Sequence, residues 1–126
     1  LAEHRGVPTL IVMHHPPVVS GIGWMDPDPG EKWIANFAAA LAGFEDQVLA
    51  IHCGHLHRQI TTSFRGITLS VTPSVAPLVS LDLRPISSAR PDSRALITTE
   101  PPTYALHHWD GRALVTHYER VSDWDV

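Results

Sequence analysis

Apolar runs alternate with one amphipathic segment in the first half of the chain. Thr9–Met13 and Val48–Cys53 are short, continuous and rich in β-branched residues, which predicts two buried strands. Between them, residues 31–43 repeat apolar side chains at helical spacing, with an acidic residue at the start and Gly43 at the end, which predicts a surface helix. The apolar positions of this helix are Ile34, Phe37, Ala38 and Leu41.

The order strand, helix, strand predicts that the two strands run parallel, joined by a right-handed crossover. The carboxyl ends of both strands then lie at one edge of a sheet, where α/β proteins place their ligands. Residues 16–30 hold four prolines and three glycines, so we expect an irregular loop there, lying over that edge.

The second half has a β pattern. Residues 59–64 and Ile67–Val71 flank Arg65-Gly66, which predicts a hairpin, and residues 76–83 suggest a further strand. Residues 84–94 combine prolines, serines and charges and indicate an exposed connection.

A terminal hairpin is predicted for residues 104–109 and 112–119, because they surround Asp110-Gly111. With a two-residue turn, Leu106 should lie opposite Val115. The same register places His107 opposite Leu114 and His117 opposite Tyr104. We therefore expect structural or interface roles for these two histidines and for His108.

Composition bounds the function. A chain of 126 residues with 44% hydrophobic and 17% charged residues suits a single α/β domain with one core. The formal charge of -4 argues against a nucleic acid polymer as partner, and no run approaches the about 20 apolar residues that span a membrane. The one cysteine, Cys53, is expected to be buried and inert, and its solitary occurrence favours a cytoplasmic protein.

Histidines follow both buried strands. His14 comes directly after the first strand, and Gly54-His55-Leu56-His57 follows the second. Glycine allows a sharp turn after the strand, and histidines two apart can then turn both imidazoles into one space. Because both strand ends lie at the same edge, we expect His14, His55 and His57 to converge as neutral nitrogen ligands of a metal. His52, which precedes the turn, is expected to pack between layers or to bond a backbone group.

These blocks resemble a known family. Met13-His14-His15-Pro16-Pro17, the stretch from Gly21 to Asp26, and Gly54-His55-Leu56-His57 are similar to the last signature blocks of the calcineurin-like metallophosphoesterases, in particular class III cyclic nucleotide phosphodiesterases and glycerophosphodiesterases. The resemblance runs from about Thr9 to the end. It implies the C-terminal portion of a four-layer α/β/β/α sandwich that ends in a β-hairpin.

The resemblance also implies a site. His14 and His55 would bind one metal and His57 a second, in a dinuclear centre of divalent or trivalent ions (Fe, Mn, Zn or Co) that hydrolyses a small phosphodiester, either a cyclic nucleotide or a glycerophosphodiester. His15 would be catalytic, by orienting the loop or contacting the substrate. Trp24 and Asp26, in the loop over the metals, would bind substrate, although the same loop would equally fit packing onto the core or a neighbouring subunit.

The family's earlier blocks, Asp-x-His, Gly-Asp and Gly-Asn-His, do not occur in the sequence. We therefore expect residues 1–126 to be the C-terminal half of a metallophosphoesterase domain that is inactive alone. The alternative is a noncatalytic module that binds a metal or a partner through an exposed apolar face. Such a face would also favour a homo-oligomer.

Overall fold

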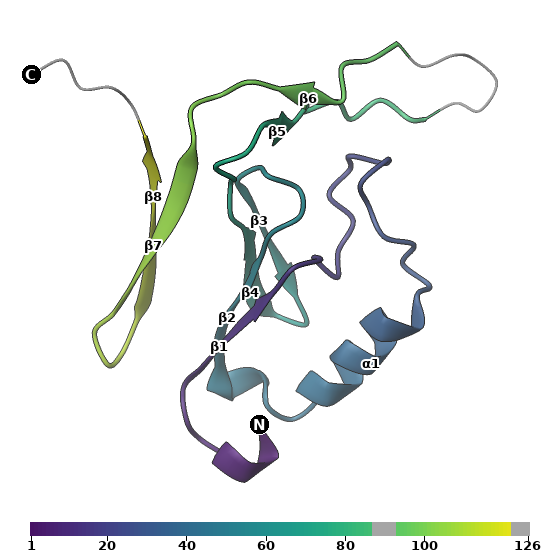
Figure 1. The fold of residues 1–126 in the computed structure, drawn as a ribbon. Helices are drawn as coiled ribbons and strands as arrows, with labels where there is room; N and C mark the ends of the chain where they lie inside the picture. Colours follow the sequence, from purple (N-terminus) through teal and green to yellow (C-terminus); the bar gives the residue numbers. More distant parts are fainter. Residues whose placement is uncertain (87–92, 122–126) are drawn as a thin grey trace, which may run out of the picture.

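A computed structural model describes residues 1–86 and 93–121, and it shows a mixed α/β protein (Figure 1). The helical elements are η1 (Ala2–His4), α1 (Lys32–Leu41) and η2 (Glu45–Gln47). The strands are β1 (Thr9–Met13), β2 (Val48–Cys53), β3 (Ile60–Phe64), β4 (Ile67–Val71), β5 (Leu78–Val79), β6 (Ile97–Thr98), β7 (Thr103–Trp109) and β8 (Leu114–Arg120). Within the described ranges, no helix has the length and apolar character that crossing a bilayer requires.

The central sheet has four strands in the order β1-β2-β4-β3. β1 runs parallel to β2 and β2 parallel to β4, whereas β3 and β4 form an antiparallel hairpin. Arg65 and Gly66 turn this hairpin with φ angles of 52° and 80°, the left-handed conformations that a two-residue turn requires. The predicted strands, their parallel pairing and this hairpin are confirmed.

Helix α1 covers one face of the central sheet (Figure 1). Its Leu41 is buried, and Phe37 stacks on Phe64 of β3 with ring centroids 5.6 Å apart. The buried residues of this core are Leu41, Val48, Ile51, Cys53, Leu56, Ile67, Leu69 and Val71. The predicted surface helix is confirmed, as is the irregular conformation of residues 16–30.

Strand β1 is less buried than the sequence predicts. It lies at the edge of the sheet, and its Val12 is 74% exposed. Val12 pairs with His52 and lies on the face of the sheet opposite to its neighbours Ile11 and Met13, which pack against the core. An apolar run therefore marks a strand here without implying that both its faces are covered.

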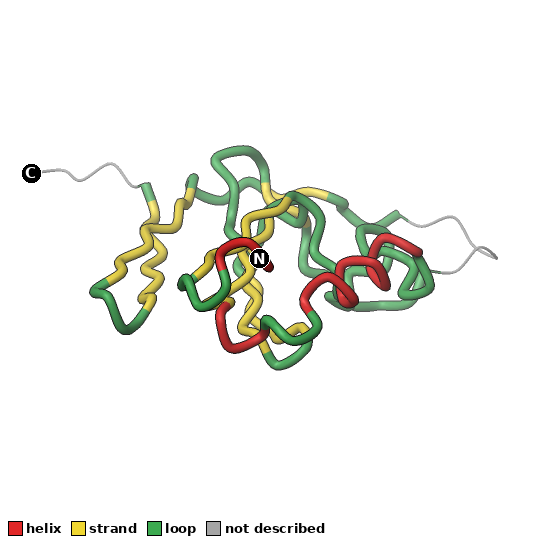
Figure 2. The backbone as a smooth tube through the Cα atoms, turned by 90° about the horizontal axis from the view of Figure 1, so that it is seen from below, coloured by secondary structure: helices red, strands yellow, loops and turns green. Residues whose placement is uncertain are grey.

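The terminal hairpin of β7 and β8 lies on the other side of the central sheet from α1 (Figures 1 and 2), and its His107 ring stacks on His52 of β2. Its predicted register is wrong by two residues. Leu106 pairs with His117, and Val115 pairs with His108. The turn is longer than two residues because the Asp110 carboxylate accepts hydrogen bonds from the backbone N–H groups of Arg112 and Ala113, both at 2.7 Å.

The strand predicted over residues 76–83 is shorter than expected. Only Leu78–Val79 forms a strand, and it pairs with Ile97–Thr98, which the sequence did not indicate. Of the predicted exposed connection, residues 84–86 and 93 are exposed, and residues 87–92 lie outside the described part. The Arg94 side chain is only 7% exposed, because its guanidinium donates to the carbonyls of Arg84 and Pro85 and lies near Asp82.

Candidate metal centre

The site begins where β1 and β2 end. Met13 pairs with Cys53 in the parallel register, so the two chains leave the sheet side by side. The Gly54 N–H then donates to the His14 carbonyl at 3.0 Å. This bond continues the strand pairing by one step and places His14 and His55 at the same edge, as the sequence predicts.

The turn after β2 has an unusual backbone. His55 and His57 have φ angles of 67° and 53°, in the left-handed region that non-glycine residues rarely adopt. Between them, Leu56 is fully buried in the core. The buried Leu56 side chain anchors this segment in the core, and backbone strain of this kind is typical of functional sites.

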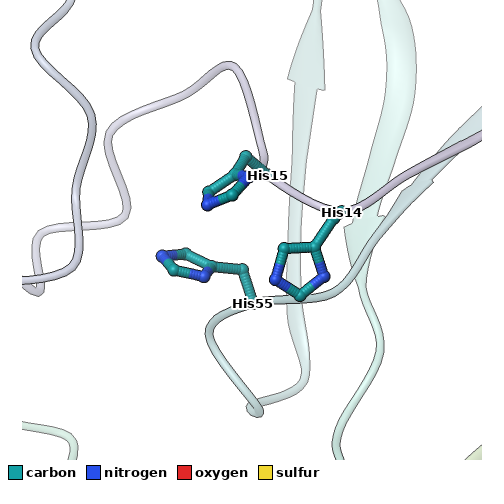
Figure 3. Close-up of side chains that lie close together, drawn as sticks. All are labelled: His14, His15 and His55. Atoms are coloured by element: carbon teal, nitrogen blue, oxygen red, sulfur yellow. The ribbon is translucent and has the colours of Figure 1, made fainter.

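Three imidazoles meet at this edge (Figure 3). The ring centroids of His14 and His55 lie 5.3 Å apart, those of His15 and His55 4.2 Å, and those of His14 and His15 4.7 Å. One nitrogen of each ring lies within 4.8 Å of the others. The structure thus brings His14 and His55 together, as expected, and adds His15.

This donor set fits a metal ion of the borderline type. Two imidazole nitrogens on one zinc-like ion, each about 2.0–2.1 Å from it, lie at most about 4.2 Å apart, so a small side-chain movement would close the group around an ion. The pKa of His55 is lowered, first by burial and then by the neighbouring His15, His14 and His57. A lowered pKa favours the neutral imidazole, the form that binds metals.

His57 lies outside this group of three. Its Nδ1 lies 2.9 Å from the Pro77 carbonyl oxygen, which follows β4. In metal sites, a ligating histidine commonly bonds a carbonyl through one ring nitrogen and the metal through the other. The contact with Pro77 leaves Nε2 of His57 available, so its ligand role stays a prediction.

The two loop residues predicted to bind substrate have other surroundings. Asp26 accepts hydrogen bonds from the Ser20 N–H at 2.7 Å, the Ser20 hydroxyl at 2.5 Å and the Gly21 N–H at 2.9 Å. It thereby closes the loop on itself. The indole Nε1 of Trp24 is buried and has no hydrogen-bond partner in the described part of the chain. The substrate roles of both residues stay predictions.

A cavity of about 500 Å³ adjoins the three histidines. Its other lining residues are Met13, Pro16, Met25, Pro27, Glu31 and Trp33. The sequence reasoning missed Glu31 and Trp33, because it assigned the acidic residue to the helix dipole. An acidic residue at the start of the helix that follows the site's loop, with a tryptophan two residues later, was the available signal.

His52 and Cys53 stay outside this cavity. His52 Nδ1 lies 2.5 Å from the Ser70 hydroxyl, and its ring stacks on His107 of the hairpin. Of the two roles expected for His52, packing between layers is confirmed, because its buried ring lies between the central sheet and the hairpin; its hydrogen-bond partner is a side chain and not a backbone group. Cys53 is buried, and burial raises the pKa of its thiol to about 12, which agrees with the expected inert residue.

The sequence is similar to known phosphodiesterases over most of its length. It is 36% identical over 117 residues to a "probable glycerophosphodiester phosphodiesterase" of Arcobacter nitrofigilis, covering 92% of this chain and 40% of that protein. It is 26% identical over 122 residues to the glycerophosphodiester phosphodiesterase of Enterobacter lignolyticus, covering 97% of this chain and 41% of that protein. It is 30% identical over 123 residues to the 3',5'-cyclic adenosine monophosphate phosphodiesterase of Escherichia coli K12, covering 91% of this chain and 38% of that protein.

The chain therefore spans about 40% of the length of these curated relatives, and it matches their C-terminal part. No family model matches the sequence.

Proposed function

Because the chain belongs to the calcineurin-like metallophosphoesterases and matches their C-terminal part, we propose that it supplies histidine ligands to a metal centre that hydrolyses small phosphodiesters. The substrate class is a cyclic nucleotide or a glycerophosphodiester, the two classes in the relatives' names. In this proposal residues 1–126 form the C-terminal half of a four-layer sandwich.

The observation that carries the proposal is the grouping of His14, His15 and His55, with one nitrogen of each within 4.8 Å of the others. These residues come from the ends of two parallel strands and are joined through the Gly54–His14 backbone bond. Sheet pairing therefore fixes their spacing in advance, which is what a metal centre requires of its ligands.

His14 and His55 would hold one ion and His57, through Nε2, would hold a second. Two such ions, when bound, supply an activated water and neutralise charge on the phosphoryl group. His15 lies against His55 and lines the cavity, so it is positioned to donate a hydrogen bond to a phosphoryl oxygen. Met13, Met25 and Pro27 line the same cavity and would limit the access of bulk water.

The metal-ligand group of the described residues contains histidines only. A dinuclear centre also needs bridging oxygen ligands, and two divalent cations about 4 Å apart without them repel each other by about 17 kcal/mol at an effective dielectric near 20. We therefore expect residues 1–126 alone to hydrolyse little or no phosphodiester.

The test is hydrolysis of bis(p-nitrophenyl) phosphate by the natural protein that carries this sequence, with bound metal measured in the same samples. We expect turnover that chelators abolish and that His55→Ala reduces together with metal content. Leu106→Ala, on the exposed face of the hairpin, serves as the matched control and should retain both. Metal binding without turnover in the natural protein would favour the noncatalytic module instead.

A further inference from the structure

The cavity beside the histidines is lined by two chemically different groups of polar side chains. One group is His14, His15 and His55. The other includes Glu31, the residue that precedes α1, and Trp33 in its first turn. Their side chains are joined, because the Trp33 indole N–H donates to Glu31 Oε2 at 2.6 Å. We call these two residues the Glu31–Trp33 pair.

The Glu31 carboxylate closes the turn before α1 and does not bond the N–H groups of the helix itself. Glu31 is the N-cap residue of α1, yet its side chain makes no cap hydrogen bond. Its Oε1 instead accepts from the Asp28 N–H at 3.3 Å, and its Oε2 accepts from Trp33. Both bonds orient the carboxylate and the indole relative to each other.

Glu31 is exposed, and its favourable neighbours are the start of α1 and the N–H groups that donate to it rather than a basic side chain. In the described residues, no Lys or Arg forms an ion pair with it, since the ion pairs there involve Glu45, Asp82 and Glu100. A phosphodiester is an anion, and a carboxylate in the cavity that receives it repels it. The repulsion is offset when the substrate carries a positive charge beside Glu31.

The other residues that line the cavity indicate which kind of positively charged group would bind there. Met13, Met25, Pro16, Pro27 and Trp33 are apolar or aromatic. A primary ammonium is strongly hydrated and loses much of its hydration free energy in such surroundings. A methylated ammonium has an apolar surface and is attracted to indole rings. A volume of about 500 Å³ accommodates a small diester of this kind.

We propose that the Glu31–Trp33 pair determines specificity and selects a phosphodiester in which one alcohol carries a quaternary ammonium, as in a choline ester. The phosphoryl group would lie at the histidines and the ammonium at the pair. This inference rests on the proposed phosphodiesterase function.

The experiment uses the natural metal-loaded protein and two substrates that differ in one atom. These are p-nitrophenyl phosphocholine and its neutral carbon isostere, p-nitrophenyl 3,3-dimethylbutyl phosphate. In both, water adds to phosphorus and the bond to p-nitrophenolate breaks, so the leaving group is constant. We expect kcat/KM to be about 3-fold to 30-fold higher for the choline ester.

Variants locate the preference. Glu31→Gln and Trp33→Leu should each bring the kcat/KM ratio of the two substrates close to one, while Trp33→Phe, which keeps an aromatic ring, should retain part of it. Lys32→Gln is the matched control. Lys32 lies between Glu31 and Trp33 in the sequence, but it is exposed and does not line the cavity, so the kcat/KM ratio should stay at its wild-type value. The ratio of the two kcat/KM values does not change when part of a protein sample is inactive, because both values fall by the same factor.

Inhibition provides a readout that does not depend on turnover of either ester. Phosphocholine should inhibit hydrolysis of bis(p-nitrophenyl) phosphate more strongly than 3,3-dimethylbutyl phosphate does, and Glu31→Gln should remove the difference. Equal rates and equal inhibition in the wild-type protein overturn the inference while the phosphodiesterase function stands. Absence of bis(p-nitrophenyl) phosphate hydrolysis overturns the proposed function, and the inference with it.

Discussion

The imidazoles of His52 and His107 stack with centroids 4.0 Å apart and an interplanar angle of 30°. His52 lies on β2, inside the central sheet, and His107 lies on β7 of the hairpin on the side of the sheet opposite α1 (Figure 1). His52 is only 5% exposed, and its Nε2 is buried without a hydrogen-bond partner among the described residues. Burial, followed by the neighbouring His107, lowers the pKa of His52 to about 4.

This lowered pKa predicts acid sensitivity. An unfolded chain protonates His52 near its ordinary pKa of 6.5, whereas the folded chain keeps it neutral down to about pH 4. Between these values the unfolded state binds more protons, so the free energy of unfolding should fall as the pH falls from 6.5 towards 4. Urea unfolding at several pH values from 7.5 to 4.5 measures this slope.

A variant tests whether His52 causes this dependence of the unfolding free energy on pH. His52→Gln keeps a group that can bond the Ser70 hydroxyl but does not titrate, so its unfolding free energy should depend less on pH in this range. His117→Gln, on the exposed outer face of the hairpin, should keep the wild-type slope. Equal slopes in the wild type and His52→Gln would contradict the assignment.

Leu56 should be essential for stability although it sits in the turn that forms the site. Its side chain is fully buried, and Leu56→Ala leaves a cavity, which should lower the free energy of unfolding by about 2–5 kcal/mol. Leu106→Ala, at a position that is 60% exposed, should change it by less than about 0.5 kcal/mol. Chemical denaturation of both variants at pH 7.5 is the measurement.

The left-handed backbone of His55 predicts a conflict between stability and metal binding. A non-glycine residue in this conformation costs about 1–2 kcal/mol, and glycine loses about 0.5–1 kcal/mol of backbone entropy. His55→Gly should therefore leave the metal-free protein as stable as wild type, or more stable by up to about 1 kcal/mol, while it abolishes metal binding. His14→Gly removes a histidine where φ is not positive, so it should destabilise. A large decrease in the free energy of unfolding of His55→Gly would contradict the inference that the backbone is strained at His55.

Metal titrations should separate the roles of the four histidines. We expect His14→Ala, His55→Ala and His57→Ala each to weaken metal binding by at least about 10-fold to 100-fold, the loss caused even by removing a ligand's hydrogen-bond partner. His15→Ala should keep the metal and lower turnover. The reverse pattern, with His15 needed for metal and His57 dispensable, would place the ion within the group seen in Figure 3.

The pairing of His14 with His55 was predictable from sequence because parallel strands place their carboxyl ends at one edge, and both strands were recognisable as apolar runs. Cys53 was predictable as a buried residue for the same reason. The cluster's third member, His15, was not, because adjacent residues after a strand do not reveal which side chain turns toward the second strand.

Other features depend on contacts that no local pattern encodes. The hairpin register follows from the Asp110 carboxylate binding two backbone N–H groups, which lengthens the turn that Asp110-Gly111 suggested. The exposure of Val12 follows from the position of β1 at the edge of the sheet. Glu31 joins the cavity through its bond with Trp33, although a glutamate at this position is equally typical of an ordinary helix start.

Pairing of Met13 with Cys53 makes the alignment of two strands part of the site's chemistry. Successive strand residues point to opposite faces, so a slip of β1 by a single residue would carry His14 about 3.3 Å along the edge and turn its ring to the opposite face. Insertions or deletions within β1 or β2 should therefore abolish function even when the sheet still forms.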